Sequence, residues 1–150
     1  MATKGKRVII AGSADYDVKP LYVEGVCLTA SLLPGTVVEQ VATGLQTNAS
    51  AATVFGQMPL VADMDLLRQK TVDDAWVQNE NMQAVRVREN EFVNVLVAAG
   101  NNITARGVGL SLNGSGLLKI ALTDGTEQIL FYSDEIINVT ANALVRVRVA

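Results

Sequence analysis

The stretch from Ala84 to Lys119 constrains the fold of this chain most, because it contains consecutive strand signals and no catalytic chemistry. Within it, Val85-Arg86-Val87-Arg88 alternates apolar and basic side chains, with the period of two expected of a strand that has one buried and one solvated face. The same four residue types recur at Val145 to Arg148. The pattern therefore predicts β-structure and a protein that binds through its surface.

Turn signals divide the rest of the chain into further strands. Pro34-Gly35 suits the central positions of a type II turn, and Asn113-Gly114 and Asp124-Gly125 are strong hairpin signals. Between these turns, β-branched and apolar runs predict strands over residues 23–30, 36–41, 92–98, 108–112, 117–123, 126–132 and 143–149. About eight closely connected strands favour a mainly β fold, a small antiparallel barrel or sandwich, over an α/β sheet.

Three segments lack strand signals. Residues 1–20 combine cations with small and acidic residues and end in Lys19-Pro20, so we interpret them as an extended N-terminal arm. Residues 43–52 are small and polar without a period and predict a loop. Residues 63–70 carry acids early and cations late and predict one short helix. The expected organisation is an arm over residues 1–20 and a single β-rich domain over residues 21–150.

Composition excludes several classes of function. The chain has 150 residues, no histidine and one cysteine, so His-based catalysis and an intrachain disulfide are ruled out. Its net charge of −3 provides no overall basic field for nucleic acid. Hydrophobic residues make up 49% of the chain and mean hydropathy is +0.28, which suits a chain that covers apolar surface in an assembly.

Apolar runs are too short for a signal-peptide core or a membrane span. Val8 to Ala11 is followed at once by polar residues, and no run approaches the ~20 apolar residues that a spanning helix needs. We expect no membrane partner and a protein made in a cytoplasm.

The densest carboxylate group is Asp63, Asp65, Asp73 and Asp74, whose oxygens are ligands of a kind that Mg²⁺ accepts. On a helix, however, residues two apart do not share a face, and Asp63 is a natural N-cap. We expect no metal, no cofactor and no enzymatic activity.

Binding residues are expected among the cations and the single tryptophan. The candidates are Lys4, Lys6, Arg7, Trp76, Arg86, Arg88, Arg146 and Arg148. The two arginine rows form either a solvated strand face or, if their strands pair, a basic band that binds an acidic surface. Trp76 is either an interface anchor or a core residue at the edge of a barrel.

The run from Phe92 to Gly107, followed by Leu110-Ser111-Leu112-Asn113-Gly114-Ser115-Gly116, resembles the decoration (cement) proteins of tailed-bacteriophage capsids. Leu33-Pro34-Gly35-Thr36 matches an earlier turn of that family. The resemblance covers about residues 20 to 120, and residues 58–80 form an insertion outside its pattern.

The resemblance implies a β-tulip or barrel domain that binds the outer surface of an expanded capsid between major capsid protein subunits. It implies a shell-stabilising role without an active site, location on the virion, and self-association, with a trimer favoured and a dimer possible. The basic arm suits such a protein, because arms in this family often order against the lattice.

Two alternatives stay open. One is another virion β-protein, such as a tail-tube or head-completion subunit. The other is a lipoyl or biotinyl carrier domain, which Val95 to Gly100 also resembles. A carrier holds its modified lysine at a hairpin tip, but here the tip is Asn113 to Gly116 and Lys119 lies in the next predicted strand.

Overall fold

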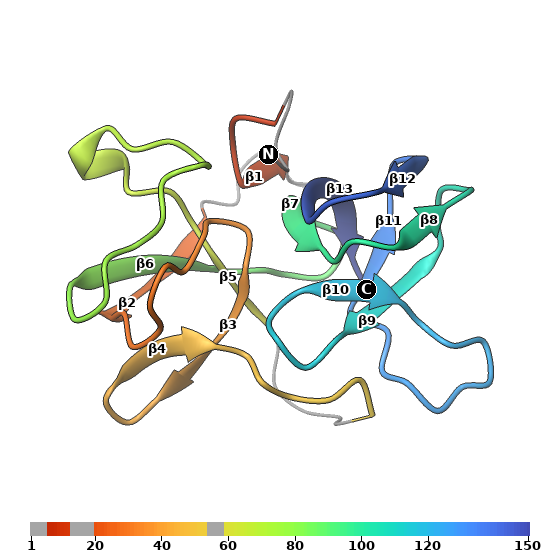
Figure 1. The fold of residues 1–150 in the computed structure, drawn as a ribbon, viewed down its shortest axis with the longest axis horizontal. Helices are drawn as coiled ribbons and strands as arrows, with labels where there is room; N and C mark the ends of the chain where they lie inside the picture. Colours follow the sequence, from red (N-terminus) through yellow and green to blue (C-terminus); the bar gives the residue numbers. More distant parts are fainter. Residues whose placement is uncertain (1–5, 13–19, 54–58) are drawn as a thin grey trace.

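The computed structural model describes residues 6–12, 20–53 and 59–150, which form two large β-sheets and a small two-stranded one (Figure 1). The expected mainly β fold is confirmed. Strand pairing is antiparallel throughout the described residues, except for the β7–β10 pair and the Cys27–Leu45 bridge, which are parallel.

The first large sheet closes into a five-stranded barrel. Its strands follow the order β7-β10-β9-β11-β13, and β13 pairs again with β7. They are β7 (Phe92–Val97), β9 (Gly109–Leu112), β10 (Leu118–Ile120), β11 (Phe131–Ser133) and β13 (Ala143–Val149). Alternation along β13 sends Val145 and Val147 into the core and keeps Arg146 and Arg148 partly exposed. The valines of the Val-Arg-Val-Arg pattern thus help to fill the barrel.

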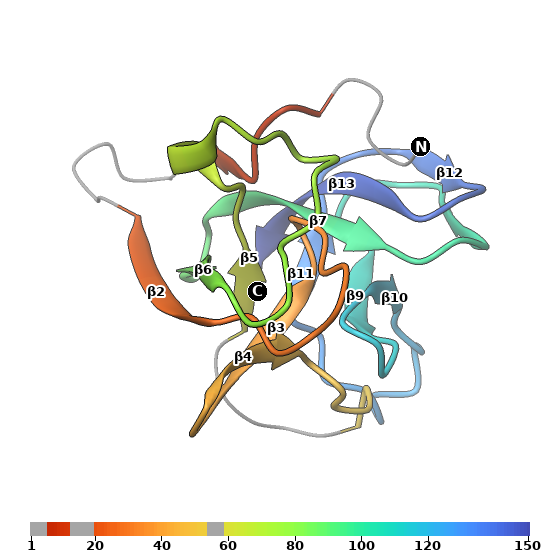
Figure 2. The ribbon, with the colours of Figure 1, turned by 60° about the vertical axis from the view of Figure 1, so that its left-hand side comes forward.

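The second large sheet lies beside the barrel (Figure 2). Its strands, in the order β2-β6-β5-β3-β4, are β2 (Leu21–Val26), β6 (Asn81–Arg86), β5 (Leu60–Ala62), β3 (Val37–Val41) and β4 (Gly44–Thr47). A single bridge between Cys27 and Leu45 connects the end of β2 to β4. This sheet therefore nearly closes on itself.

Each sheet has a hydrophobic core, and the second sheet contributes to both. Its residues Val37, Val61 and Val85 belong to the cluster centred on the barrel. The neighbouring residues Val38 and Leu60 belong to a smaller cluster on the opposite face. Since successive strand residues point to opposite faces, the second sheet is sandwiched between the barrel and its own loops.

A two-stranded sheet extends one end of the barrel. It pairs β8 (Asn101–Ile103) with β12 (Ile137–Val139). Only residues 140–142 separate β12 from β13, yet these two strands pair with different neighbours. They therefore diverge after a short turn.

The described part of the N-terminal segment contacts the barrel. Ile9 is fully buried, β1 (Ile10–Gly12) pairs with β7, and the Asn94 side chain donates a hydrogen bond to the Val8 carbonyl at 2.7 Å. Extended backbone was expected here, and the stretch from Val8 to Gly12 is fixed to the domain by these contacts. Lys4 lies outside the described residues, and the division at residue 20 stays a prediction.

Two local predictions were wrong. Instead of the expected helix, residues Leu66–Arg68 form a single 3₁₀ turn. Asp65, and not Asp63, caps its start, and Gln69 ends it with a left-handed backbone conformation. None of its residues is buried, so no apolar face offsets the cost of helix nucleation. Within the expected loop 43–52, residues 44–47 form β4. Pairing with β3 holds this segment as a strand, although its sequence has no strand pattern.

Candidate binding surface

The two arginine rows do not pair. Arg86 is exposed on β6, whose partners are β2 and β5, whereas Arg146 and Arg148 lie on β13 between β7 and β11. The basic band that paired rows would make is therefore not formed within one chain.

The arginines of β13 are engaged by neighbouring side chains. Arg146 Nε donates to Asp134 Oδ2 at 2.6 Å. Arg148 donates to Asn90 Oδ1 at 2.8 Å, and its guanidinium lies 5.3 Å from the centroid of the Tyr132 ring. Such contacts fix the side chains and satisfy part of their charge, so these arginines are less available to a partner than Arg86.

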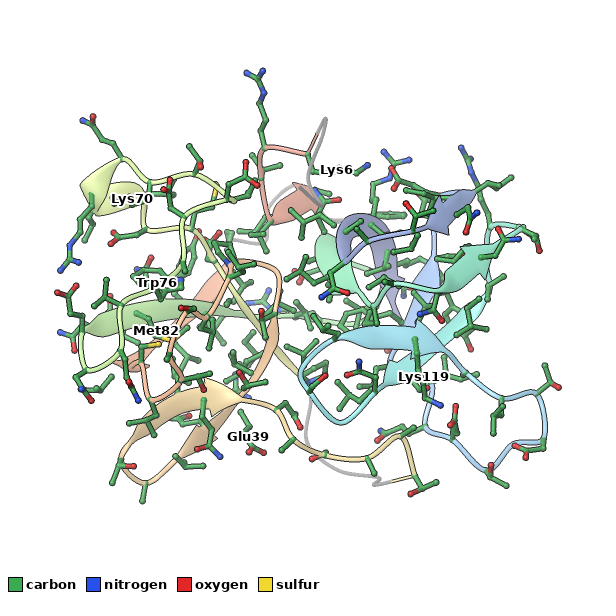
Figure 3. All side chains as sticks on the ribbon, viewed as in Figure 1. Lys6, Glu39, Lys70, Trp76, Met82 and Lys119 are labelled. Carbon is green, nitrogen blue, oxygen red and sulfur yellow. The ribbon has the colours of Figure 1, made fainter. Side chains whose placement is uncertain are left out.

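Of the two alternatives for Trp76, an interface anchor or a core residue, the structure shows a core residue. Its exposed fraction is 7%, it packs in the smaller cluster, and its Nε1–H donates to the Asp63 carbonyl at 2.7 Å (Figure 3). Burial raises the pKa of the neighbouring Asp63 carboxyl, which accepts from the Met64 N–H. The pair anchors the loop after β5 to the second sheet.

Lys6 lies where two grooves meet, on the side of the molecule that carries the described N-terminal segment (Figure 3). We call the first the β12 groove: it has a volume of about 640 Å³ and runs along β12 and the start of β13, with Lys6, Arg106, Glu135 and Arg146 in its lining. The second, the loop groove, has a volume of about 480 Å³ and lies between the N-terminal segment and the loop after β5.

The loop groove combines cations with apolar side chains. Lys6, Arg7 and Lys70 line it together with Leu66, Val72 and one acidic residue, Asp73. Arg7 and Lys70 are exposed. Leu67, which follows Leu66 in the 3₁₀ turn, is 92% exposed and lines a separate pocket with Arg68 and Trp76. An exposed leucine next to unburied cations is a suitable contact for a partner that is both apolar and acidic.

Sequence reasoning did not select Arg106, Glu135 or Leu67. Glu135 forms an ion pair with Lys6, which lies 129 residues away. No local pattern links residues so distant. A signal did exist for Leu67: two adjacent leucines in a polar segment without a helical apolar face are candidates for exposure.

The acidic side chains and Cys27 were the remaining candidates for a metal site or a reactive thiol. Across residues 6–12, 20–53 and 59–150, no group of three or more His, Cys, Asp or Glu side chains could hold a metal ion. Cys27 is buried, and burial raises the pKa of its thiol, which disfavours the reactive thiolate. Among the same residues no helix is long and apolar enough to cross a membrane.

The sequence matches no protein-family model and no curated protein. The fold is similar to the crystal structure of the head fiber gp8.5 N base in bacteriophage phi29, with a TM-score of 0.50 and 12% sequence identity. The likeness covers 88% of this chain and 95% of that chain. At this identity the comparison shows a shared fold.

Proposed function

We propose that this chain is a structural protein of a tailed-bacteriophage head and acts as a decoration protein on the capsid. The observation that carries the proposal is the fold, which is shared with a phage head fiber base over nearly the whole of both chains. The turn motifs at Pro34-Gly35 and Asn113 to Gly116 point to the same class through their resemblance to decoration proteins.

The proposal includes the partners. The chain binds the major capsid protein on the outer surface of the virion and associates with itself, with a trimer favoured over a dimer. High apolar content and exposed leucines support this assembly role. Repeated docking on a lattice gives avidity even when each single contact is weak.

The loop groove is the favoured capsid contact. It places Arg7 and Lys70 beside Leu66, which precedes the exposed Leu67 in the 3₁₀ turn. Arg86, at the end of β6, and Arg88, two residues beyond that strand, are the competing contact.

Undecorated, expanded heads of the phage that encodes the chain provide the test. The purified protein should sediment with the heads in a saturable way, and cryo-electron microscopy should show it between capsid subunits. Absence of binding would contradict the decoration role.

Matched variants distinguish the two contact surfaces. Leu67→Ser with Arg7→Glu should weaken binding while leaving the melting temperature nearly unchanged, because both side chains are exposed. Arg86→Ser with Arg88→Ser should bind as the wild type does. If only the Arg86→Ser/Arg88→Ser variant loses binding, and the loss depends on salt, the capsid contact is at Arg86 and Arg88 instead.

A fiber base is the second candidate, since the similar structure is itself described as the base of a head fiber. Cryo-electron microscopy separates the two functions. Compact density that covers capsid interfaces supports decoration, whereas density continuing outward from the bound domain supports a fiber base.

A further inference from the structure

The β12 groove lies between two strand edges that have no strand partner in the described part of the chain. β12 pairs with β8 on one side only. On β13, pairing with β11 is confined to Val147–Val149, so the edge from Ala143 to Arg146 carries no strand. Unpaired edges that border a groove are templates for an added strand.

The Glu135 side chain takes the place of a strand at the end of this edge. The Asp134 N–H donates to the Arg146 carbonyl at 3.0 Å, and the Arg146 N–H donates to Glu135 Oε2 at 3.2 Å. Backbone groups of alternate residues point to the same edge, so Leu144 is the next residue to present its backbone toward the groove. A carboxylate thus already satisfies one backbone donor at this position.

The lining is basic although the chain is acidic overall. Lys6, Arg106 and Arg146 line the groove with Glu135 as the acidic residue, whereas the net charge of the chain is −3. Glu135 pairs with Lys6, and Asp134 pairs with Arg146. Arg106 is exposed and forms no ion pair within the described residues. An occupant that brings a carboxylate to Arg106 complements this lining.

An apolar contact lies at the same place. Ile136, directly before β12, is 67% exposed and lines the groove. An extended segment alternates its side chains, so it presents apolar residues and carboxylates on separate faces.

We propose that the β12 groove binds an extended, acidic segment of a partner protein, which adds as a strand to the unpaired edge of β12. Its backbone pairs along the free edge of β12, a carboxylate meets Arg106, and an apolar side chain covers Ile136. The chain's own N-terminal residues complement the groove poorly, because Lys4 adds positive charge.

This proposal holds for any partner and does not depend on a role in a phage head. It is tested with the free protein and a peptide, so its failure is distinct from a failure to bind heads.

The probe is an acetylated and amidated hexapeptide of alternating valine and glutamate. Two control peptides replace each glutamate with lysine, or carry an N-methyl group on every residue. The lysine peptide reverses the charge. The N-methylated peptide keeps the charge and removes the backbone N–H donors. Titration into isotopically labelled protein, followed by amide chemical shifts, locates and quantifies binding.

The acidic peptide should give saturable shifts at Ile137–Val139 and Arg106, and the two control peptides should bind much more weakly. Arg106→Glu should weaken binding by about tenfold or more. The matched control is Arg86→Glu, an exposed arginine on the second sheet, which should bind as the wild type does. Circular dichroism checks that both variants fold.

Each contrary result overturns the proposal. Equal binding of the N-methylated peptide excludes strand addition, and equal binding of the lysine peptide excludes an acidic occupant. Shifts outside the groove, or none, exclude the site. If the amides of β12 respond to protein concentration and not to peptide, the occupant is a second copy of the chain.

Discussion

The barrel closes through six paired positions between β13 and β7, whereas the second sheet is joined at its ends by the single Cys27–Leu45 bridge. In the barrel, the short segment 113–117, which contains Asn113-Gly114, connects β9 to β10, while the second sheet carries the long loop with Trp76 and the exposed Leu67. The barrel is therefore the closed part of the molecule, and the second sheet carries the exposed loop. The shared valines Val37, Val61 and Val85 make the second sheet depend on the barrel.

Phe131→Ala should have the largest effect and tests this dependence. Phe131 is fully buried in the barrel, so its truncation should cost about 3–5 kcal/mol of unfolding free energy. The only tryptophan, Trp76, lies in the other cluster and reports on the second sheet. Urea unfolding followed by circular dichroism and by Trp76 fluorescence should show the same lowered midpoint. An unchanged fluorescence midpoint would mean that the sheets unfold separately.

A smaller effect is expected where the two sheets touch. Gly116 has a φ of +74°, and its carbonyl accepts from the Val37 N–H. A Cβ there would lie 2.8 Å from the Val37 carbonyl oxygen, so Gly116→Ala should cost roughly 2–5 kcal/mol through strain and overpacking.

Gly114 in the same turn is the matched control, with a φ of +89° but open space around its Cβ position. Gly114→Ala should therefore cost only the left-handed backbone term of about 1–2 kcal/mol. Chemical denaturation measures both variants. Equal losses would show that contact between the sheets at Gly116 adds nothing.

Two carboxylates, one in each region, should respond to pH with opposite signs. In the barrel region, hydrogen bonds from Lys119, the Leu122 N–H and Ser111 lower the pKa of Glu127. Its stabilisation is present above the ordinary glutamate pKa and is lost as pH falls through the lowered value. Glu127→Gln should cost about 1–2 kcal/mol at neutral pH and progressively less in acid.

Asp63, beside the second sheet, behaves in the opposite way, because burial raises its pKa and the ionised form opposes folding. That penalty is present above the raised pKa and is relieved as pH falls through it. Asp63→Asn keeps an acceptor for the Met64 N–H and should stabilise the protein at neutral pH, with the gain fading in acid. Melting temperatures across pH check both signs. A loss of stability in Asp63→Asn at neutral pH would show that the charged form is needed.

The smallest effect is expected at the N-terminus. Removal of residues 1–7 deletes the ion pair between Lys6 and Glu135, both partly exposed, and should cost less than about 1 kcal/mol. Ile9→Ala, only two residues further along, should cost about 2–5 kcal/mol because Ile9 is fully buried. Thermal unfolding compares the two. A large loss of stability from the truncation would mean that residues at or before position 7 also contribute to the core.

Short-range signals predicted much of the fold. The Pro34-Gly35 turn forms with Gly35 at φ +87°, and the strand predicted over residues 143–149 coincides with β13. These features follow from local backbone freedom and from alternation along one strand. The expected helix was wrong, and the loop expected over 43–52 was wrong for residues 44–47, since packing and cross-strand pairing overrode local propensity there.

The candidate surfaces were predicted only in part. Lys6 and Arg146 were selected for their charge, but nothing local indicated that they would share a groove with Arg106 and Glu135. Trp76 was left between core and interface, because an aromatic side chain in a polar segment is compatible with both. Its position depends on the Asp63 carbonyl and the smaller cluster, which only the folded chain brings together.

The sequence determined that the chain is built from short strands with glycine turns and lacks histidine-based chemistry, since residue types and alternation fix both. The tertiary structure decided that β13 closes the barrel on β7, that Arg86 and Arg146 lie on separate sheets, and that Lys6 meets Glu135. These outcomes join residues about 50 to 130 positions apart, and such contacts form only when the whole core is buried together.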